Sequence, residues 1–474
     1  MRLWGDIQVT QFIGGPYSRA QIEARLAREI ASMDEYGIQY WPVFLLADGE
    51  FAGCCGLRPY KPEEKICELG FHFRPQYWGK GLALEAARAN LVARVKGNGS
   101  KRPILLMGHT DVVGVQRERW SVDPFGAVRK NGLIYGRGAT DDRPHVVAGM
   151  MILLLLNRLH VKLDRDVIFL AEAGEEGTTG VGIDYMVNQH WPEIEAEYAL
   201  AEGGAAVEDS GKVHDVLVTV TEKVPRGIRL VAHGPSGHAS RPTNQNAVVH
   251  LAAAVAKAGA WQTPMRLSPT TRAYFERLAA ISPAAEAVRY RGILNPARAP
   301  AVDRYFRDHE PGHYSILRTS VVPTEMQSGF RTNVIPSNGE AYLDVRALPD
   351  EDMRQFLAEL RRVISDPTVD IVPSQNAERP AAPPSRTDTE MFRALERVGR
   401  RMFAAPTLPG MLTGATDSAQ LRAKGVQAYG VGPIGPASEG TLGGAHSDDE
   451  NLSVRSLDKL VEYLWSAVLE VAAQ

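Results

Sequence analysis

The sequence has few cysteines, no cluster of like charges and no long apolar run. Its three cysteines all fall within the first seventy residues, so we expect neither a disulfide framework nor a thiolate metal site further along the chain. The formal net charge is −3 and there is no Lys/Arg run, which leaves no basic surface for nucleic acid or an anionic membrane. Any metal must therefore be held by His, Asp and Glu, and neither nucleic acid nor a membrane is expected as a partner.

Signals for membrane insertion and export are missing as well. The longest apolar run, residues 146–156, is about half of the ~20 residues that a membrane-spanning helix needs, so it predicts a buried helix. The first ten residues, MRLWGDIQVT, include an acidic side chain and no apolar stretch of signal-peptide length. We therefore expect a cytoplasmic protein. At 474 residues the chain is longer than one hydrophobic core usually supports, which predicts two or three domains.

The first part of the chain, residues 1–89, differs in pattern from the rest. Here a helix is expected at 19–30 and strands at 40–46 and 66–73. From residue 103 onward, short apolar runs such as PILLMG and DVIFLAEA alternate with helical patterns. This alternation is typical of an α/β fold with a largely parallel sheet and covering helices.

A change of pattern in the middle of the chain indicates an insertion. Stretches rich in strand formers begin near residue 216, and the alternation of strands and helices resumes after the turn-rich ERPAAPPSRTD. We interpret residues 223–374 as a domain inserted into a catalytic domain that comprises residues 90–222 and 375–474.

Histidines and acidic residues follow the ends of the strand-like runs. His109 and Asp111 follow PILLM, Glu175 and Glu176 follow VIFLAEA, Glu202 follows YAL, and His446 lies in GTLGGAH. Ligands of open α/β sheets bind at the carboxyl ends of strands, so these side chains should meet at one edge of the sheet. Together with Asp141 of GRGATDD they form a set of donors suited to Zn²⁺, Mn²⁺ or Co²⁺, and we take zinc first.

Each of these residues has a simpler explanation when it is taken singly. His109 fits a hydrogen-bonded core histidine, and Asp111 and Asp141 fit helix caps. Glu175 and Glu176 fit a solvated pair. Adjacent carboxylates that follow an apolar strand repel each other unless a cation or a proton intervenes, however. The joint pattern therefore favours a metal site.

Eight ordered motifs resemble those of one enzyme family. HTDVV, GRGATDD, AGEEG, AEGG, SGHASRP, NVIP, LDVR and GGAH resemble motifs of the dinuclear zinc amidohydrolases and peptidases, which include aminoacylase, carboxypeptidase S, succinyl-diaminopimelate desuccinylase and glutamate carboxypeptidase. The resemblance covers residues 90–474. It implies a zinc-peptidase-like, mostly parallel sheet with helices on both faces and an inserted α+β lid or dimerisation domain. It also implies a metallopeptidase or amidohydrolase that cleaves the amide bond of a small N-acyl amino acid or dipeptide with a free carboxylate.

The same resemblance implies a set of metal ligands. Asp141 would bridge two zinc ions, for which cobalt or manganese could substitute. His109 and Glu202 would complete one metal site, and Glu176 and His446 would complete the other.

Catalytic and substrate-binding roles are implied in the same way. Glu175 would be the general base, and Asp111 would orient the metal-binding imidazole two residues before it. His238 of SGHAS would contact the oxyanion, reaching across a homodimer interface, while Asn333 and Arg346 would hold the carbonyl and carboxylate of the substrate. Simpler explanations stay open for the last two: Arg346 fits the exposed face of a strand, and Asn333 fits a turn cap.

Two further features bear on the substrate and on the site. The segment from about residue 260 to 318 resembles the carboxypeptidase S branch, which favours an apolar group on the acyl side. Asp417 of GATDS resembles another family position, but an N-cap of the helix that follows is the simpler explanation.

A glycine-rich turn near residue 80 resembles a second family. Gln76, Gly79 and Gly81 of QYWGKGLA fit the turn with which GNAT acetyltransferases hold the pyrophosphate of acetyl-CoA, and about eighty-five residues resemble their ribosomal-protein branch. The match stops at about residue 89, before the strands that form the other wall of the cofactor cleft. We therefore expect a truncated GNAT-like α/β segment without acetyl-CoA. Acetyl transfer and a catalytically silent fusion are the alternatives to hydrolysis.

Overall fold

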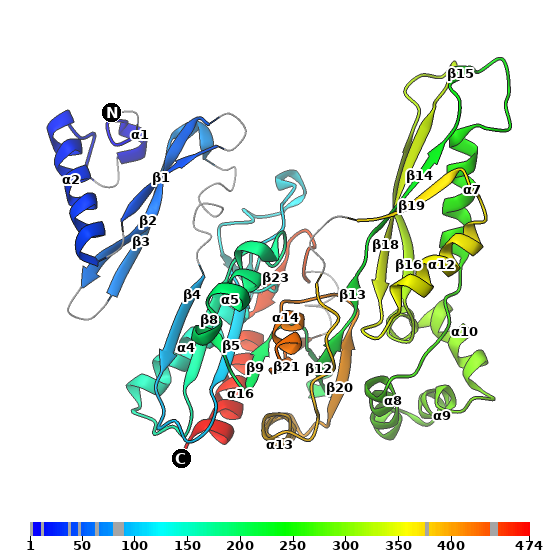
Figure 1. The fold of residues 1–474 in the computed structure, drawn as a ribbon. Helices are drawn as coiled ribbons and strands as arrows, with labels where there is room; N and C mark the ends of the chain where they lie inside the picture. Colours follow the sequence, from blue (N-terminus) through cyan, green and yellow to red (C-terminus); the bar gives the residue numbers. More distant parts are fainter. Residues whose placement is uncertain are drawn as a thin grey trace. The chain divides into compact units, whose positions relative to one another are not determined.

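The computed structural model describes residues 3–10, 14–36, 39–45, 49–61, 66–78, 90–374, 379–436 and 444–474 (Figure 1). The chain divides into two compact units, Met1–Ala89 and Asn90–Gln474. Each unit has a hydrophobic core of its own. Within the described residues, no helix is both long and apolar enough to cross a membrane.

The described part of the N-terminal unit combines helices with one antiparallel sheet. It contains α1 (Ile7–Thr10), α2 (Arg19–Tyr36), β1 (Tyr40–Phe44), β2 (Phe51–Lys61) and β3 (Ile66–Phe73), with the strands in the order β1-β2-β3. Trp4, Ile22, Tyr40 and Cys54 form its core. A short 3₁₀ turn, η2 (Pro75–Tyr77), contains Gln76. Gly79 and Gly81 lie outside the described residues.

A seven-stranded sheet forms the centre of the second unit, in the order β20-β12-β21-β9-β5-β8-β4. Its strands are β4 (Leu91–Val95), β5 (Ile104–His109), β8 (Val167–Glu172), β9 (Tyr198–Ala201), β12 (Val216–Glu222), β20 (Thr407–Leu412) and β21 (Gln427–Gly430). Every residue of β5 and β8 is buried, which explains their continuous apolar sequences. The inner strands β21, β9, β5 and β8 are parallel, as predicted, whereas β4, β12 and β20 run the other way and make the sheet mixed.

Helices cover both faces of this sheet, which confirms the predicted architecture. On one face α4 (Arg143–Arg158), α13 (Glu390–Phe403) and α16 (Val454–Ala472) form the larger core. On the other, α5 (Ile183–Gln189), α6 (Trp191–Ile194) and α14 (Ser418–Ala423) pack on the same strands. The apolar run that predicted a buried helix lies in α4.

Small sheets and turns surround the main sheet. β6 (Val128–Lys130), β7 (Leu133–Tyr135) and β23 (Asn451–Ser453) form one of them, and β10 (Ala206–Asp209), β11 (Lys212–Val213) and β22 (Ile434–Pro436) form another. The 3₁₀ turns η3 (Arg117–Arg119) and η4 (Thr179–Val181) lie in the connections.

Residues 223–374, which the sequence predicts to be an inserted domain and which are called the inserted segment below, contain an antiparallel sheet backed by helices. β13 (Val224–Pro225), β14 (Ile228–His233), β16 (Ser320–Ser328), β18 (Asn338–Ala347) and β19 (Val369–Pro373) form the sheet, and α7 (Ala247–Ala260) and α12 (Met353–Ile364) share its core. A short ladder of β15 (Gly237–His238) and β17 (Val334–Ile335) lies at the end farthest from α8 in Figure 1.

The remaining helices of the inserted segment pack against the main sheet. They are α8 (Pro269–Ile281), α9 (Ala284–Ile293), α10 (Ala299–His309) and α11 (Pro311–Ser315). Phe275 and Phe306 share a core with Met411 of the edge strand β20. Arg277 of α8 donates hydrogen bonds to Glu396 at 2.6 Å and to the carbonyl of Thr407 at 2.8 Å. This part of the insertion therefore covers an edge of the main sheet.

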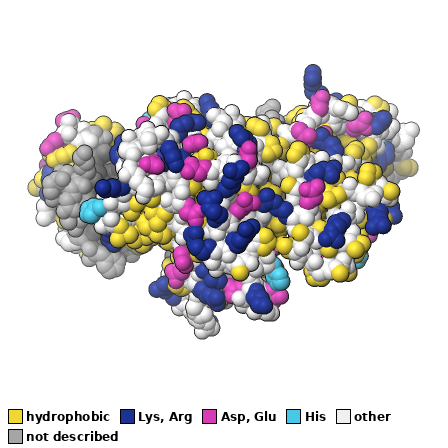
Figure 2. Space-filling model, turned by 90° about the horizontal axis from the view of Figure 1, so that it is seen from below, with side chains coloured by type: hydrophobic (Ala, Val, Ile, Leu, Met, Phe, Trp, Pro, Cys, Tyr) yellow, Lys and Arg dark blue, Asp and Glu magenta, His cyan; other side chains and the backbone are white. Residues whose placement is uncertain are grey.

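Positive and negative side chains are mixed on the face shown in Figure 2. That view is from below, the side on which α13 lies in Figure 1, and basic side chains gather there among acidic ones. Arg397 and Arg401 of α13 pair with Glu470 at 2.9 and 2.5 Å. The basic residues of this helix are thus partly neutralised by their own chain.

Candidate metal centre

The predicted ligands lie where adjacent parallel strands of the main sheet end. His109 is the last residue of β5, Glu176 follows β8, and Glu202 follows β9. Asp141 precedes α4, and His446 precedes β23. The expected gathering at the carboxyl ends of the strands is therefore present.

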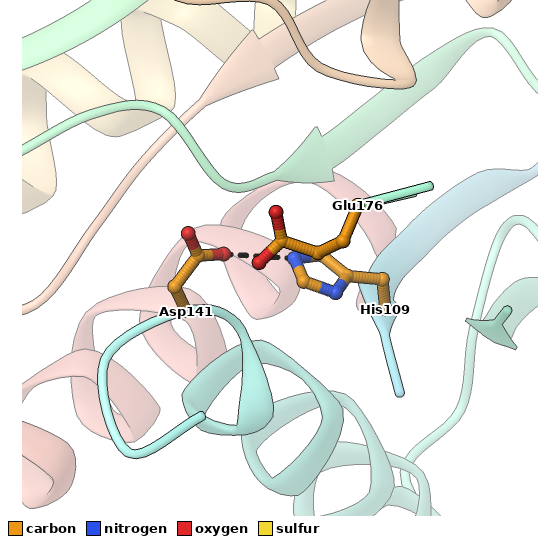
Figure 3. A group of neighbouring side chains, drawn as sticks. All are labelled: His109, Asp141 and Glu176. Atoms are coloured by element: carbon orange, nitrogen blue, oxygen red, sulfur yellow. Dashed lines mark hydrogen bonds and ion pairs between the residues drawn. The ribbon is translucent and has the colours of Figure 1, made fainter. Parts of the chain in front are cut away.

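Asp141 lies between the two histidines. Its Oδ1 is 2.8 Å from Nε2 of His109, and its Oδ2 is 3.3 Å from Nε2 of His446. Glu176 Oε2 is 3.0 Å from the same His446 nitrogen, and Glu202 Oε2 is 3.9 Å from His109 Nε2. Figure 3 shows His109, Asp141 and Glu176 pointing toward one another, and one donor atom of each lies within 4.8 Å of the others.

Burial and neighbouring charges shift the pKa values of these carboxyl groups in different directions: burial would raise the pKa of Asp141, but the hydrogen bond to His109 outweighs it and leaves that pKa lowered. Burial, and next the charge of Asp142, raises the pKa of Glu202 well above its usual value. Burial and the charge of Asp141 likewise raise the pKa of Glu176. For His109, burial alone would lower the pKa, but hydrogen bonds to Asp111 and Asp141 outweigh it and leave the pKa raised. A divalent cation would relieve this repulsion, and the nitrogen and oxygen donors fit zinc.

Asp142 belongs to the cluster although sequence reasoning did not single it out. Its carboxylate, His109 and Glu202 form a second group with donor atoms within 4.8 Å of one another. Asp142 is 1% exposed; its Oδ1 accepts a hydrogen bond from His145, and its Oδ2 has no partner among the described residues. The doubled acid in GRGATDD was the signal available for this residue.

Asp111 supports the loop that carries the two glutamates. Its carboxylate accepts hydrogen bonds from the backbone N–H groups of Gly174, Glu175 and Glu176 at 2.8, 3.2 and 3.1 Å. The nearest Asp111 oxygen to His109 Nδ1 is the backbone carbonyl at 3.1 Å, while the carboxylate Oδ1 lies 3.6 Å away. Asp111 thus contacts both the imidazole and the loop of the proposed base, but its hydrogen bond to the imidazole is made by the backbone carbonyl and not by the carboxylate that was predicted to orient the ring.

Glu175 is buried beside an arginine from a distant part of the chain. Arg379 Nη2 donates to Glu175 Oε1 at 2.6 Å and to the Glu175 carbonyl at 3.0 Å, while Nη1 donates to Asp417 Oδ1 at 2.8 Å. The side chain of Asp417 is 1% exposed. Asp417 occupies the N-cap position of α14 but makes no capping hydrogen bond, so the simpler explanation offered by the sequence was wrong. Its partner is Arg379.

Glu450 holds the loop that presents Asp141. It is 0% exposed, and it accepts hydrogen bonds from Arg137 at 2.6 Å and from the backbone N–H groups of Gly138, Thr140 and Asp141 at 3.2, 2.7 and 3.1 Å. Sequence reasoning missed Glu450 too. The acidic run SDDE directly after His446 was the only local signal for it.

A residue at the start of the second unit also contacts the loop that carries Glu175 and Glu176. Asn90 accepts a hydrogen bond from the backbone N–H of Ala173 at 3.1 Å and donates one to the carbonyl of Val181 at 2.8 Å. Ala173 and Val181 flank Glu175 and Glu176 in sequence. This loop is therefore held by Asn90 as well as by Asp111.

The predicted substrate-binding residues of the inserted segment lie apart from this cluster. His238 is exposed, and its Nδ1 accepts hydrogen bonds from the backbone N–H of Ser240 at 3.1 Å and pairs with the Ser240 hydroxyl at 2.7 Å. Asn333 is exposed, and Arg346 forms a two-pronged pair with Asp344 at 2.8 and 3.2 Å. In the part of the chain that is described, no hydrogen bond or ion pair joins these three residues to the metal ligands.

Comparison with family models supports the family resemblance of both parts of the chain. The model described as "Peptidase family M20/M25/M40" matches residues 105–470, and the acetyltransferase (GNAT) domain model matches residues 1–102. The GNAT match agrees with the resemblance inferred from the N-terminal sequence.

Curated relatives cover most of the second unit. The human N-fatty-acyl-amino acid synthase/hydrolase PM20D1 is 26% identical over 381 residues, which are 78% of this chain and 74% of that protein. Mouse aminoacylase-1 is 27% identical over 342 residues, 71% of this chain and 73% of its own length. A probable carboxypeptidase S-like protein of Dictyostelium discoideum is 26% identical over 396 residues, 81% of this chain and 74% of that protein.

Solved structures show the same fold. The M20 family metallo-carboxypeptidase Sso-CP2 of Sulfolobus solfataricus matches with a TM-score of 0.60 at 15% identity, over 95% of this chain and 94% of that one. Human carnosine dipeptidase 1 matches with a TM-score of 0.56 at 14% identity, over 99% of this chain and 95% of that one. From residue 105 to residue 470, the chain belongs to peptidase family M20/M25/M40, a family of metal-dependent hydrolases.

Proposed function

We propose that residues 90–474 form a dinuclear zinc hydrolase that cleaves the amide bond of a small N-acyl amino acid or dipeptide with a free carboxylate. The observation that carries the proposal is the position of Asp141, whose two carboxylate oxygens face two different histidines. One carboxylate shared by two ligand sets suits a pair of ions about 3.5–4 Å apart.

The proposed ligand sets are those that the family resemblance implies, and the contacts of Asp141 with both histidines support them. His109 and Glu202 would hold one ion, and Glu176 and His446 the other, with cobalt or manganese as alternatives to zinc. The ions would supply an activated water and an electrophile for the scissile carbonyl. Asp142, beside the first ligand set, adds negative charge that favours a dication there.

Glu175 would act as the general base. Arg379 engages its Oε1, so Oε2 is the oxygen left to take a proton from water and return it to the leaving amine. The hydrogen bonds that the backbone N–H groups of Gly174, Glu175 and Glu176 donate to the Asp111 carboxylate restrain the loop that carries Glu175. Such restraint favours a base that has to act repeatedly at one atom.

Two observations favour an N-acyl amino acid with an apolar acyl group. The name N-fatty-acyl-amino acid synthase/hydrolase specifies an apolar acyl group, whereas the name aminoacylase-1 specifies only an acylated amino acid. A cavity of about 590 Å³ lies next to β12 and β20, and its walls combine apolar side chains such as Leu217 and Leu412 with the polar side chains of Glu286, Arg289, Glu310 and His313. Thr219 and Leu412 are also the neighbours of Gly203, next to a metal ligand, at 3.3 and 3.4 Å from the place of an added Cβ.

The inserted segment would complete the site in a homodimer. Here Asn333 and Arg346 would bind the carbonyl and carboxylate of the substrate, and His238 would reach the oxyanion of the partner subunit's site. His238 and Asn333 are exposed, and within the described residues none of the three makes a hydrogen bond or ion pair to the proposed metal ligands, which supports a role that depends on another surface. The domain boundaries 90–222, 223–374 and 375–474 belong to the same proposal.

Metal content and substrate release test this proposal together. Chelator-rinsed protein should retain about two zinc ions per chain and release free amino acid from N-acyl amino acids or dipeptides, and prolonged EDTA should abolish both. Protein that folds without metal and shows no turnover would count against the hydrolase. Acetyl-CoA included in the same panel tests the alternative of acetyl transfer by the N-terminal unit.

A further inference from the structure

A buried guanidinium lies directly beside the proposed base. The side chain of Arg379 is 12% exposed and that of Glu175 is 9% exposed. One nitrogen, Nη2, donates both to the carboxylate and to the backbone carbonyl of Glu175, at 2.6 and 3.0 Å. A single anchor thus holds the side chain of the base relative to its own backbone, which restricts its rotamers.

The guanidinium is itself fixed from other directions. Nη1 is bound to Asp417, which is 1% exposed and lies beside the buried carboxyl of Glu172. The backbone carbonyl of Arg379 accepts a hydrogen bond from Arg226 Nη1 at 2.9 Å. Both the side chain and the backbone of Arg379 are therefore held by hydrogen bonds other than those to Glu175.

We propose that Arg379 is a positioning residue for the hydrolysis: it holds Glu175 Oε1 so that Oε2 points at the reacting water. The inference rests on the proposed function, because it assigns a task to a residue beside that base. Glu175 Oε2 makes no hydrogen bond within the part of the chain that is described, which leaves it available for the proton transfer. Misplacement of a catalytic group by about 1 Å costs on the order of 100-fold in rate, so the orientation of this carboxylate matters.

A purely structural role is the competing explanation. Arg379 would then only neutralise the buried Asp417, and its loss would lower stability without a specific effect on the chemical step. The two explanations differ in what happens to kcat in a folded, zinc-loaded protein. They also differ in whether a free guanidinium ion can restore activity.

The experiment compares Arg379→Ala and Arg379→Lys with Arg386→Ala as the matched control. Arg386 lies seven positions after Arg379, its side chain is 70% exposed, and it pairs with Asp388. Zinc content per chain, kcat and KM are measured for each variant. We expect Arg379→Ala to lower kcat about 100-fold with KM changed less than threefold and zinc retained, and added guanidinium chloride to restore part of kcat, while Arg386→Ala matches the wild type.

Arg379→Lys keeps a cation beside Asp417, so this variant can test the proposal if Arg379→Ala does not fold. A lysine lacks the fork that binds two groups at once, and we expect at least a tenfold loss in kcat with zinc retained. Three outcomes would overturn the positioning role. They are an unchanged kcat in a folded variant, a loss of zinc from the variant, and a lowered kcat of Arg379→Ala that added guanidinium does not restore. Absence of hydrolysis by the zinc-loaded wild type would overturn the proposed function first, and this inference with it.

Discussion

Replacing Glu450 by Gln should weaken metal binding although Glu450 is not a ligand. Its carboxylate accepts hydrogen bonds from Arg137 and from three backbone N–H groups, the last of them that of Asp141. Glutamine keeps the shape but has one acceptor oxygen, and its NH₂ would face an N–H or guanidinium donor. The substitution therefore disturbs the loop that presents the shared ligand.

The magnitude follows from the burial of this group. Glu450 is 0% exposed and Arg137 7%, and removing one partner of a buried ion pair costs about 3–5 kcal/mol of stability. Groups that orient metal ligands typically contribute roughly 10–100-fold to metal affinity. We expect Glu450→Gln to lower the zinc affinity within that range and to lower the unfolding temperature of the EDTA-treated protein.

Competition with a chromophoric zinc chelator and thermal unfolding in EDTA measure these two effects separately. Glu462→Gln on α16 is the matched control, because Glu462 is exposed. A zinc dissociation constant within threefold of the wild type, with an unchanged unfolding temperature, would refute the idea that Glu450 organises the Asp141 loop. Lower stability with unchanged zinc affinity would restrict Glu450 to a structural role.

Three further predictions concern the base, the substrate carboxylate and a buried lysine. Glu175→Gln should retain zinc and fold but lose about 100-fold or more of kcat, and full activity in the zinc-loaded variant would contradict the role of the base. Arg346→Ala should raise KM for substrates with a free carboxylate much more than for their amides; equal losses would indicate a structural arginine. Burial, and next the charge of Arg346, lowers the pKa of Lys223 to about 7. The folded chain therefore releases this proton at a lower pH than the unfolded chain does. The free energy of unfolding should then rise with pH from about 7 toward the unfolded pKa near 10.4. Urea unfolding at several pH values should show a smaller rise for Lys223→Met than for the wild type.

The sequence predicted most of what depends on local pattern. Strands β5 and β8 and the ends at which His109 and Glu176 lie could be predicted, because continuous apolar runs followed by polar residues mark buried strands and their termini. The directions of β12 and β20 were not predictable in the same way, since an apolar run is equally consistent with a parallel or an antiparallel neighbour. The sheet is consequently more mixed than expected.

Residues whose partners are far away in the chain escaped sequence reasoning. Arg379 and Glu175 are 204 positions apart, and Glu450 and Arg137 are 313 positions apart, so no local pattern connects them. Asp417 shows how a local rule can fail. Its position before α14 predicted an N-cap, but its carboxylate makes no capping hydrogen bond and accepts one from the buried guanidinium of Arg379. The helices α8–α11 present a similar case. Their apolar residues indicate burial, but only the folded chain shows that the partner is the edge strand β20.

The edge position of β4 has an evolutionary consequence. Among the described residues, β4 is the terminal strand of the seven-stranded sheet and pairs with β8 alone, so no described strand pairing of this sheet involves the sequence before β4. Asn90, directly ahead of β4, keeps its hydrogen bonds to the loop of the glutamates as long as an exchange stops before it. We therefore expect that a leading module can be exchanged ahead of Asn90 while the contacts that hold the loop of Glu175 and Glu176 are kept.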